Sequence, residues 1–250
     1  MQRYFLELAY DGTDFFGWQR QPSEISVQEE IEDALSKLYS NTPVKVVGCG
    51  RTDTGVHANH YILHVDLPEI ENTDSFVFKL NRMLPNSIAF HKATPARAES
   101  HARFDASQRT YRYFIHQKKN PFKQKHSWYV PQALDFEKMN EAAKLLVGKK
   151  DFTSLSKLHT DVKTNICAIN KAQWIITDDE IYFEISANRF LRNMVRATVG
   201  TLIDVGHGKI EPEQINEILE AKDRQAASTS VPAHGLFLWL ITYPQFKQLK

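Results

Sequence analysis

The chain is poor in cysteine and lacks long apolar runs, and these absences exclude several classes of protein. Its 250 residues include only Cys49 and Cys167, without a CxxC pair, which excludes a disulfide framework and a cysteine-rich zinc site. No stretch approaches the roughly 18 apolar residues of a membrane helix, and the opening MQRYFLELAYDG lacks the features of a signal peptide. We therefore expect a cytoplasmic protein.

A charge excess of either sign is also missing. Lys plus Arg number 31 and Asp plus Glu 30, so the net charge of +1 gives no bulk signal for a polyanionic partner. Any nucleic-acid site must come from local clustering. The sequence has no HExxH, GxSxG or GxxxxGK[ST] motif and no zinc deaminase pattern, so we expect no metal and favour chemistry by a single carboxylate.

The first half predicts a ferredoxin-like unit. Ser26 and Glu29 form a capping box ahead of a helix that runs to about Tyr39. The element order is β-α-β-β-α-β, which places helices on one face of an antiparallel sheet. We predict strands at residues 3–10, 44–48, 60–67 and 87–94, and helices at 26–39 and 74–84.

The second half repeats that order of elements. Asp135 can cap its first helix and Gly148 can end it. We predict strands at 109–117, 168–177, 180–187 and 235–244, and helices at 135–148, 189–206 and 212–223. The fold class is therefore α+β, with halves at 1–105 and 106–250 whose antiparallel sheets lie side by side around a binding cleft.

The segment GCGRTDTGVHA, residues 48–58, is the first candidate for chemistry. Three glycines surround Arg51, Asp53 and His57 in a stretch too broken for regular structure. Glycine permits positive φ and close approach of the backbone to a ligand. A polar turn in which Asp53 caps backbone amides is the structural alternative.

The segment RTYRYF, residues 109–114, is the second candidate. Strand alternation puts Arg109, Tyr111 and Tyr113 on one face, where aromatic rings and cations can stack on bases and pair with phosphate. Half-buried tyrosines beside solvated arginines are the structural alternative.

The third candidate is the predicted helix at 189–206. Arg189, Arg192 and Arg196 recur at i, i+3 and i+7 and so would share a face. A solvated charged face is the usual reading of such a stripe. The apolar neighbours of Arg196 favour partial burial instead, and a buried arginine needs an anion as its partner.

At GRTDTGVHA the sequence resembles the TruA family of tRNA pseudouridine synthases, whose signature loop carries an essential aspartate. The resemblance implies the pseudouridine synthase fold and extends over nearly the whole chain. Its further motifs are YDGTDFFGWQRQP (10–22), SVQ (26–28), LNRMLP (80–85), HARFDA (101–106), RTYRY (109–113), DFTSLS (151–156) and FLRNMVR (190–196).

The resemblance implies an isomerase that converts uridine to pseudouridine in the anticodon arm of tRNA, at tRNA positions 38, 39 and 40. Asp53 would be the catalytic carboxylate, Arg196 the arginine that pairs with it and keeps it ionised, and Tyr111 the residue that stacks on the freed uracil. Whether Asp53 adds to the sugar, stabilises an oxocarbenium ion or removes a C2′ proton stays open.

Further residues and partners follow from the same resemblance. Arg51 would fill the place of the flipped base or contact phosphate, while His57 and Arg103 would line the substrate side and organise the loop and strand nearby. No cofactor is expected, because the isomerisation is redox-neutral. A homodimer that shares one tRNA is implied. Thr54 and Cys167 depart from the family pattern, which often has alanine and a basic residue at these two positions.

Two other functions are compatible with parts of the pattern. A passive RNA-binding protein could be built from two ferredoxin-like units, but the RNP1 motif is missing and such a module has no use for a GRTD loop. A nucleoside hydrolase or glycosidase would need a second carboxylate or a metal-bound water. No partner carboxylate can be identified from the sequence.

Overall fold

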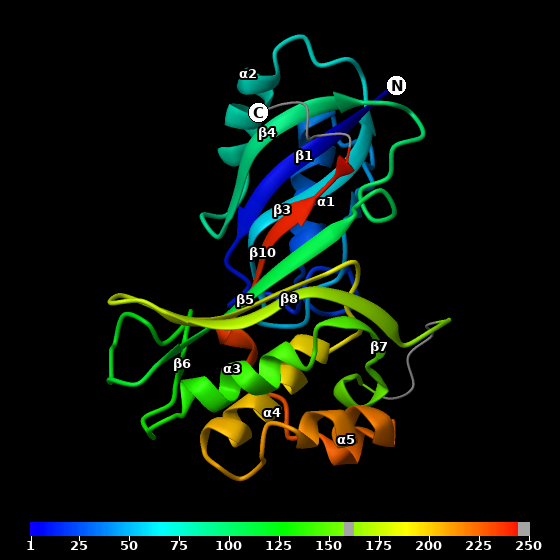
Figure 1. Cartoon of the computed structure of the whole chain (residues 1–250). Helices are drawn as coiled ribbons and strands as arrows, with labels where there is room; N and C mark the ends of the chain where they lie inside the picture. Colours follow the sequence, from blue (N-terminus) through cyan, green and yellow to red (C-terminus); the bar gives the residue numbers. More distant parts are fainter. Residues whose placement is uncertain (158–162, 245–250) are drawn as a thin grey trace. The chain divides into compact units, whose positions relative to one another are not determined.

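A computed structural model describes residues 1–157 and 163–244 of the chain as two compact units. Unit 1 comprises Met1–Ser107 and the segment from Phe237 onward, and unit 2 comprises Gln108–Leu236. Each unit combines its own strands and helices (Figure 1). Among the described residues no helix has the length and apolar character needed to cross a membrane.

Unit 1 has the ferredoxin-like strand arrangement. β1 lies between β4 and β3, antiparallel to both, and β2 pairs antiparallel with β3. β10 pairs with β3 in parallel, at His57 and Ala58. The elements are β1 (Gln2–Tyr10), α1 (Val27–Leu38), β2 (Val47–Gly48), β3 (His57–Leu67), α2 (Thr73–Asn81), β4 (Ile88–Ala96) and β10 (Leu236–Thr242).

Helix α1 confirms the predicted cap at Ser26 and buries one apolar stripe. The Ser26 side chain accepts a hydrogen bond from the Glu29 backbone N–H, which satisfies one of the free amides of the first turn. Val27, Ile31 and Leu35 recur at helical spacing and are fully buried. α1 lies behind the strands of unit 1 in Figure 1, so this stripe contributes to the core of the unit.

The predicted strand at 44–48 is wrong in its first half, because only Val47 and Gly48 pair with β3. The backbone of Val46 is bonded to α1 instead. Its N–H donates to Glu32 Oε1 at 3.2 Å, and its carbonyl accepts from Gln28 Nε2 at 3.2 Å. Side chains of the helix therefore replace the neighbouring strand at this position.

Unit 2 has a sheet in the order β5-β9-β8-β7, with its helices gathered on one face (Figure 1). Two short strands, β6 and β7, were not predicted, and β6 pairs in parallel with β5. The elements are β5 (Gln108–His116), β6 (Trp128–Tyr129), α3 (Phe136–Lys144), β7 (Gly148–Asp151), β8 (Ile166–Ile176), β9 (Ile181–Ala187), α4 (Met194–Gly206) and α5 (Gln214–Ala221).

Two predicted helix ends in unit 2 are wrong. α3 begins after Asp135 as expected but ends at Lys144, and Gly148 instead opens β7 with a φ of +111°. α4 begins only at Met194, because Asn193 takes a left-handed conformation with a φ of 65°. Asparagine tolerates this conformation better than most residues, and it interrupts the predicted helix before its first turn.

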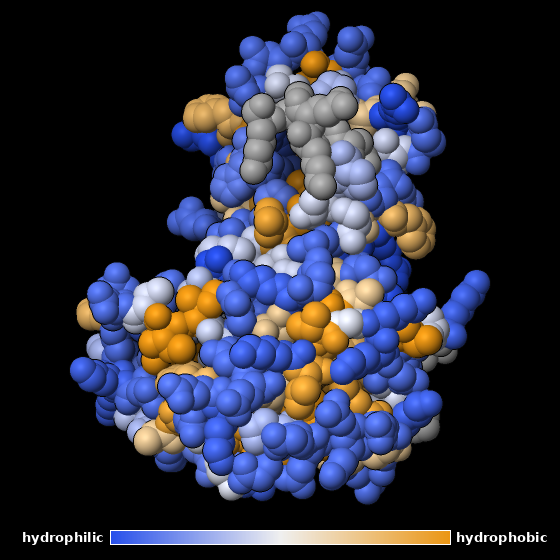
Figure 2. All heavy atoms as spheres, viewed as in Figure 1, coloured by the Kyte–Doolittle hydropathy of each residue, from blue (hydrophilic) through white to orange (hydrophobic). Residues whose placement is uncertain are grey.

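Each unit encloses an apolar core, and polar residues cover most of the molecule's visible face. Leu6, Leu8 and Leu63 are fully buried in unit 1, as are Phe152 and Phe183 in unit 2. Figure 2 shows hydrophilic residues over most of this face, with apolar residues in separate patches. Mixed helices and strands of this kind fit the predicted α+β class.

Candidate active site

Asp53 lies at the start of a tight turn in unit 1. The Val56 backbone N–H donates to the Asp53 carbonyl at 3.1 Å, and Gly55 within the turn has a φ of +73°. A positive φ at the third position of a turn favours glycine. Asp53 is half-buried, on a loop that leads directly into β3.

The loop after β1 braces this turn from the side. The Thr52 carbonyl accepts from the Trp18 N–H, and the Gly55 N–H donates to the Phe15 carbonyl, each at 3.3 Å. Gly17, with a φ of +87°, lies so close that a Cβ would stand 2.5 Å from the Thr52 carbonyl oxygen. The motif FFGW therefore fixes the backbone on which Asp53 is carried.

A cluster of aromatic rings supports the other end of the loop. Trp18 stacks on Tyr61 with ring centroids 4.1 Å apart, and the Tyr61 hydroxyl donates to the Gly50 carbonyl. Tyr10 packs against both rings, and its hydroxyl lies 2.9 Å from Thr52 Oγ1. The residues just before Asp53 are thus bonded to buried side chains, and Gly55 after it is bonded to the Phe15 backbone, which limits the freedom of the turn to move.

His57 ties the end of the same loop to the turn after β1. Its ring is fully buried, and Nδ1 lies 3.0 Å from both the Gly12 N–H and Asp11 Oδ1. These two contacts exclude one another: an unprotonated Nδ1 accepts from Gly12, and a protonated Nδ1 donates to Asp11. We favour the first, because the Gly12 N–H is buried and needs an acceptor. His57 therefore holds the end of the Asp53 loop against the turn after β1.

Arg103 is carried by the turn of the HARFDA motif. His101 Nδ1 accepts from the backbone N–H groups of Arg103 and Phe104 at 3.1 and 3.3 Å. The backbone N–H of His101 donates in turn to Asp105 Oδ2 at 2.8 Å. This turn holds Arg103 at the surface, with its guanidinium 5.8 Å from the centre of the Phe104 ring.

Arg51 and Arg103 meet at an open hollow of about 250 Å³ within unit 1. The space beside Gly50 is open, since a Cβ added there would have no neighbour within 4 Å. Two exposed cations beside polar amides offer a surface for an anionic group such as a phosphate. The hollow is lined by Trp18, Gln19, Gln28, Val46, Val47, Gly48, Gly50, Arg51 and Arg103.

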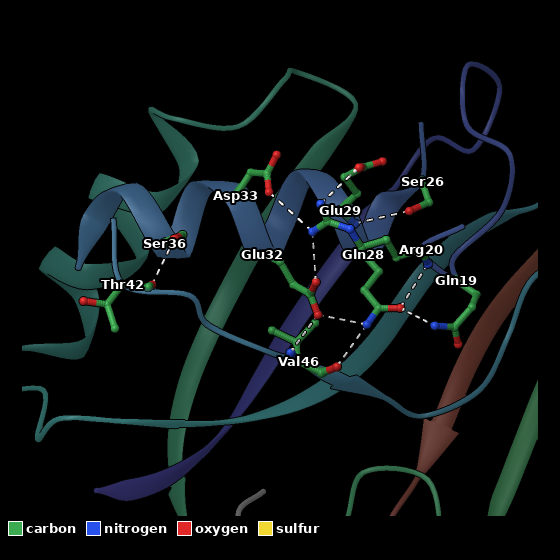
Figure 3. A network of polar contacts seen from close by, with 10 residues as sticks. All are labelled: Gln19, Arg20, Ser26, Gln28, Glu29, Glu32, Asp33, Ser36, Thr42 and Val46. Carbon is green, nitrogen blue, oxygen red and sulfur yellow. Dashed lines mark hydrogen bonds and ion pairs between the residues drawn. The ribbon is translucent and has the colours of Figure 1, made fainter. Parts of the chain in front are cut away.

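Gln28 organises the wall of this hollow (Figure 3). Its amide nitrogen donates to Glu32 Oε1 at 2.9 Å and to the Val46 carbonyl, while its oxygen accepts from Gln19 Nε2 at 2.8 Å and the Arg20 N–H at 3.1 Å. Arg20 in turn faces the carboxylates of Glu29, Glu32 and Asp33 at 3.3 to 3.5 Å.

In unit 2, β5 carries Tyr111 and Tyr113 on one face, as predicted. Tyr111 is half-buried, and its ring meets that of Phe190 edge to face at 5.1 Å and 87°. Tyr113 is fully buried, and its hydroxyl donates to the Pro232 carbonyl at 2.9 Å. Burial raises the pKa of Tyr113, which the nearby Arg196 guanidinium opposes. Tyr113 therefore has a structural position, while Tyr111 remains partly exposed.

Arg196 is the one member of the predicted arginine stripe that lies on α4. Arg189 and Arg192 precede the helix, so the three do not share a helical face as predicted. Arg196 is half-buried, and its Nε donates to the Val231 carbonyl at 2.7 Å. Val231 is followed by Pro232, whose carbonyl accepts from Tyr113, so Arg196 lies near the face of β5 that also carries Tyr111.

The predicted site residues thus fall into two groups. Unit 1 carries Arg51, Asp53, His57 and Arg103, and unit 2 carries Tyr111 and Arg196. Sequence reasoning assigned no role to Gln28 or to the residues around Val231. The SVQ motif was the only signal for the first, and nothing in the spacing of residues indicated the second.

The α+β fold of the two units fits the class of RNA-modifying isomerases to which the sequence motifs point. The family model for tRNA pseudouridine synthase matches residues 8–105 and 142–244, so the chain belongs to this family. It is 52% identical over 246 residues to "tRNA pseudouridine synthase A" of Parabacteroides distasonis, covering 98% of this chain and 97% of the relative. It is 41% identical over 239 residues to the protein of that name from Bacillus subtilis, covering 94% and 97% of the two chains.

Proposed function

We propose that this protein is a tRNA pseudouridine synthase that uses Asp53 as its only catalytic carboxylate. The observation that carries this proposal is the turn around Asp53, which the FFGW segment and the Trp18–Tyr61 stack brace from both sides. A catalytic group must be held in a fixed geometry to act on one bond of its substrate. Membership of the family supports the same reaction.

The reaction breaks the N1–C1′ bond of uridine, turns the uracil and joins C5 to C1′, after which the C5 proton leaves and N1 takes one up. A single carboxylate suffices, either by stabilising the positive charge at C1′ or by reacting with the sugar itself. We propose that Arg196 pairs with Asp53 and favours its ionised form. Its bond to the Val231 carbonyl supports this role, because it directs the guanidinium.

Tyr111 is proposed to stack on the uracil that leaves the helical stack. Extrusion of a base costs a few kcal/mol, and stacking on an aromatic ring returns about 1–3 kcal/mol. The edge-to-face contact with Phe190 supports this role, because it fixes the plane of the Tyr111 ring while part of the ring remains exposed.

The hollow beside the loop is proposed to receive the backbone of the nucleotides that flank the target. Arg51 and Arg103 would pair there with phosphate, or Arg51 would fill the space of the extruded base. His57 contributes by holding the loop, as its buried contacts support. We further propose the anticodon arm, at positions 38, 39 and 40, as the target, a homodimer as the active form and the cytoplasm, where tRNA resides, as its location.

Tritium release from tRNA labelled at uridine C5 tests this function. Isomerisation removes the C5 hydrogen, so the wild-type protein is expected to release tritium, whereas Asp53→Asn keeps the size of the side chain, binds tRNA and releases none. Asp66→Asn is the matched control, because it removes a carboxylate whose partner is Arg3 on β1. This control is expected to release tritium at the wild-type rate.

The other outcomes identify the rival functions. Tritium release that persists in Asp53→Asn would contradict the assignment of the carboxylate. Binding of tRNA without release from any of the proteins would indicate a passive RNA-binding module. Free uracil in solution would indicate a hydrolase, because water would then have replaced the base at C1′.

A further inference from the structure

Residues 228–232, the segment between α5 and β10, lie directly along helix α4. The Val231 N–H donates to the Arg196 carbonyl at 3.3 Å, while Arg196 Nε donates to the Val231 carbonyl at 2.7 Å. The segment approaches α4 so closely at Gly200 that a Cβ there would stand 2.0 Å from the Thr229 carbonyl oxygen. The direction of the Arg196 guanidinium therefore depends on where this segment lies.

The Arg224 guanidinium donates hydrogen bonds to the first part of the segment and to the residue just before it. Nη1 donates to the Ala227 carbonyl at 3.1 Å, and Nη2 donates to the Ser228 carbonyl at 2.9 Å and to Ser230 Oγ at 3.2 Å. A guanidinium presents five N–H donors in a rigid plane, so one half-buried side chain can fix three acceptors at once. These acceptors lie three to six positions along the chain from Arg224.

Other side chains complete the attachment at both ends of the segment. Asn193, just before α4, donates to Ser230 Oγ, and the Ser228 N–H donates to Thr201 Oγ1 on α4 at 3.3 Å. At the far end the Pro232 carbonyl accepts from the buried Tyr113 hydroxyl. Val231, the residue that contacts Arg196, therefore lies between two fixed points.

We propose that Arg224 is a positioning residue for isomerisation, which acts by holding residues 228–232 so that the Val231 carbonyl directs Arg196. This inference rests on the proposed role of Arg196. Arg224 is not among the residues proposed to contact tRNA. Its loss is therefore expected to misplace the Arg196 guanidinium and to leave tRNA binding intact. Small misplacements of reacting groups are enough to slow catalysis strongly.

Arg224→Ala tests the proposal in the full-length protein. The single-turnover rate of tritium release is expected to fall roughly ten- to a hundredfold, with an unchanged Kd for tRNA. Arg196→Lys is combined with it as a double-mutant cycle. In the Arg196→Lys protein, which lacks the Nε–H that donates to the Val231 carbonyl, Arg224→Ala is expected to change the rate less than about twofold.

Asn140→Ala is the matched control for a general loss of stability in unit 2. The Asn140 side chain also bonds backbone atoms, the N–H and the carbonyl of Trp174 on β8, at 2.7 and 3.3 Å. Asn140→Ala should lower the urea midpoint about as much as Arg224→Ala does, while its single-turnover rate stays at the wild-type value.

Three results would overturn the positioning role: an unchanged rate in Arg224→Ala, an equal loss of rate in both backgrounds, or a parallel loss in Asn140→Ala. In each of these cases slow release by Arg196→Lys and no release by Asp53→Asn would leave the proposed function standing. A wild-type rate in Arg196→Lys would instead remove the role of Arg196, and the positioning role with it.

Discussion

At the scale of single residues, His64 makes the stability of the HARFDA turn depend on pH. Its ring is 5% exposed, and Nδ1 accepts a hydrogen bond from the Ala102 N–H at 3.1 Å. Burial lowers the pKa of His64 to about 4, and the positive charge of Arg3 and the neighbouring His101 act in the same direction. Asp66 and Asp105 oppose them. The fold therefore holds His64 in its neutral form.

We expect acid to destabilise the protein through His64. Because the pKa in the folded state lies below that of the unfolded chain, the contribution is fully present above about pH 6.5 and is lost as the pH falls towards 4. The expected loss in the free energy of unfolding is about 2 kcal/mol between pH 7 and pH 5. Urea midpoints at the two values measure it.

His64→Asn is the comparison for this measurement. The Asn oxygen can take the place of Nδ1 as the acceptor for the Ala102 N–H, and asparagine does not titrate. The pH dependence of its midpoint should be shallower than that of the wild type by the amount just given. Equal slopes for the two proteins would show that other groups cause the loss in acid.

At the scale of elements, the loop after β1 and the Asp53 turn behave as one structure. We expect Gly17→Ala to lower the free energy of unfolding by roughly 2–4 kcal/mol, because its φ is +87° and its Cβ would strike the Thr52 carbonyl. Tritium release should fall with it, since the shift reaches Asp53. Urea unfolding and the release assay measure the two effects.

Gly50→Ala offers a contrast in the same segment. Gly50 has no positive φ, and a Cβ there meets nothing within 4 Å, so its substitution should leave the urea midpoint near that of the wild type. A similar loss of stability in both variants would mean that the GRTD segment is sensitive to any side chain, and not to the contact at Gly17.

The elements also show where prediction from sequence succeeds. α1 was predicted within a residue, because its cap at Ser26 and its apolar stripe are local signals. β2 was predicted too long, because the partners of Val46 lie on a helix 14 and 18 positions away. The start of α4 was missed because the left-handed conformation of Asn193 leaves no trace in the hydrophobic spacing.

The candidate site shows the same division. The density of glycine around Asp53 is visible in a single line of sequence, and so is the alternation that brings Tyr111 and Tyr113 to one face of β5. The hollow at Arg51 and the bonds between residues 228–232 and α4 depend on segments that fold together from distant positions. No pattern of spacing within one segment encodes such contacts.

At the scale of the whole molecule, the net charge of +1 limits how the protein can hold a polyanion. Affinity must come from a few well-placed cations, so the dependence of tRNA binding on salt should be modest. Arg51→Gln and Arg103→Gln are each expected to lower the slope of log K against log salt by about 0.7–0.9, the share of one phosphate contact. Filter binding across a salt series measures these slopes.

Arg3→Gln is the control for charge alone. Arg3 is bonded to Asp66 at 2.7 Å, so its removal changes the net charge as much as the other two substitutions do without removing a proposed phosphate contact. Its slope should match the wild type. If the slope of log K against log salt changes equally in all three variants, the net charge of the protein and not the hollow would govern binding.

The membership of β10 in unit 1 bears on how the polypeptide acquires its shape during translation. On the side of β3 that faces β10, His57 and Ala58 pair with Phe237 and Leu238, and the ring of Tyr243 packs against Phe5 at 5.5 Å. All of Gln108–Leu236 must leave the ribosome before that strand does. Unit 1 is therefore completed only after unit 2 has been synthesised, and until then the loop that carries Asp53 lies beside an open sheet edge.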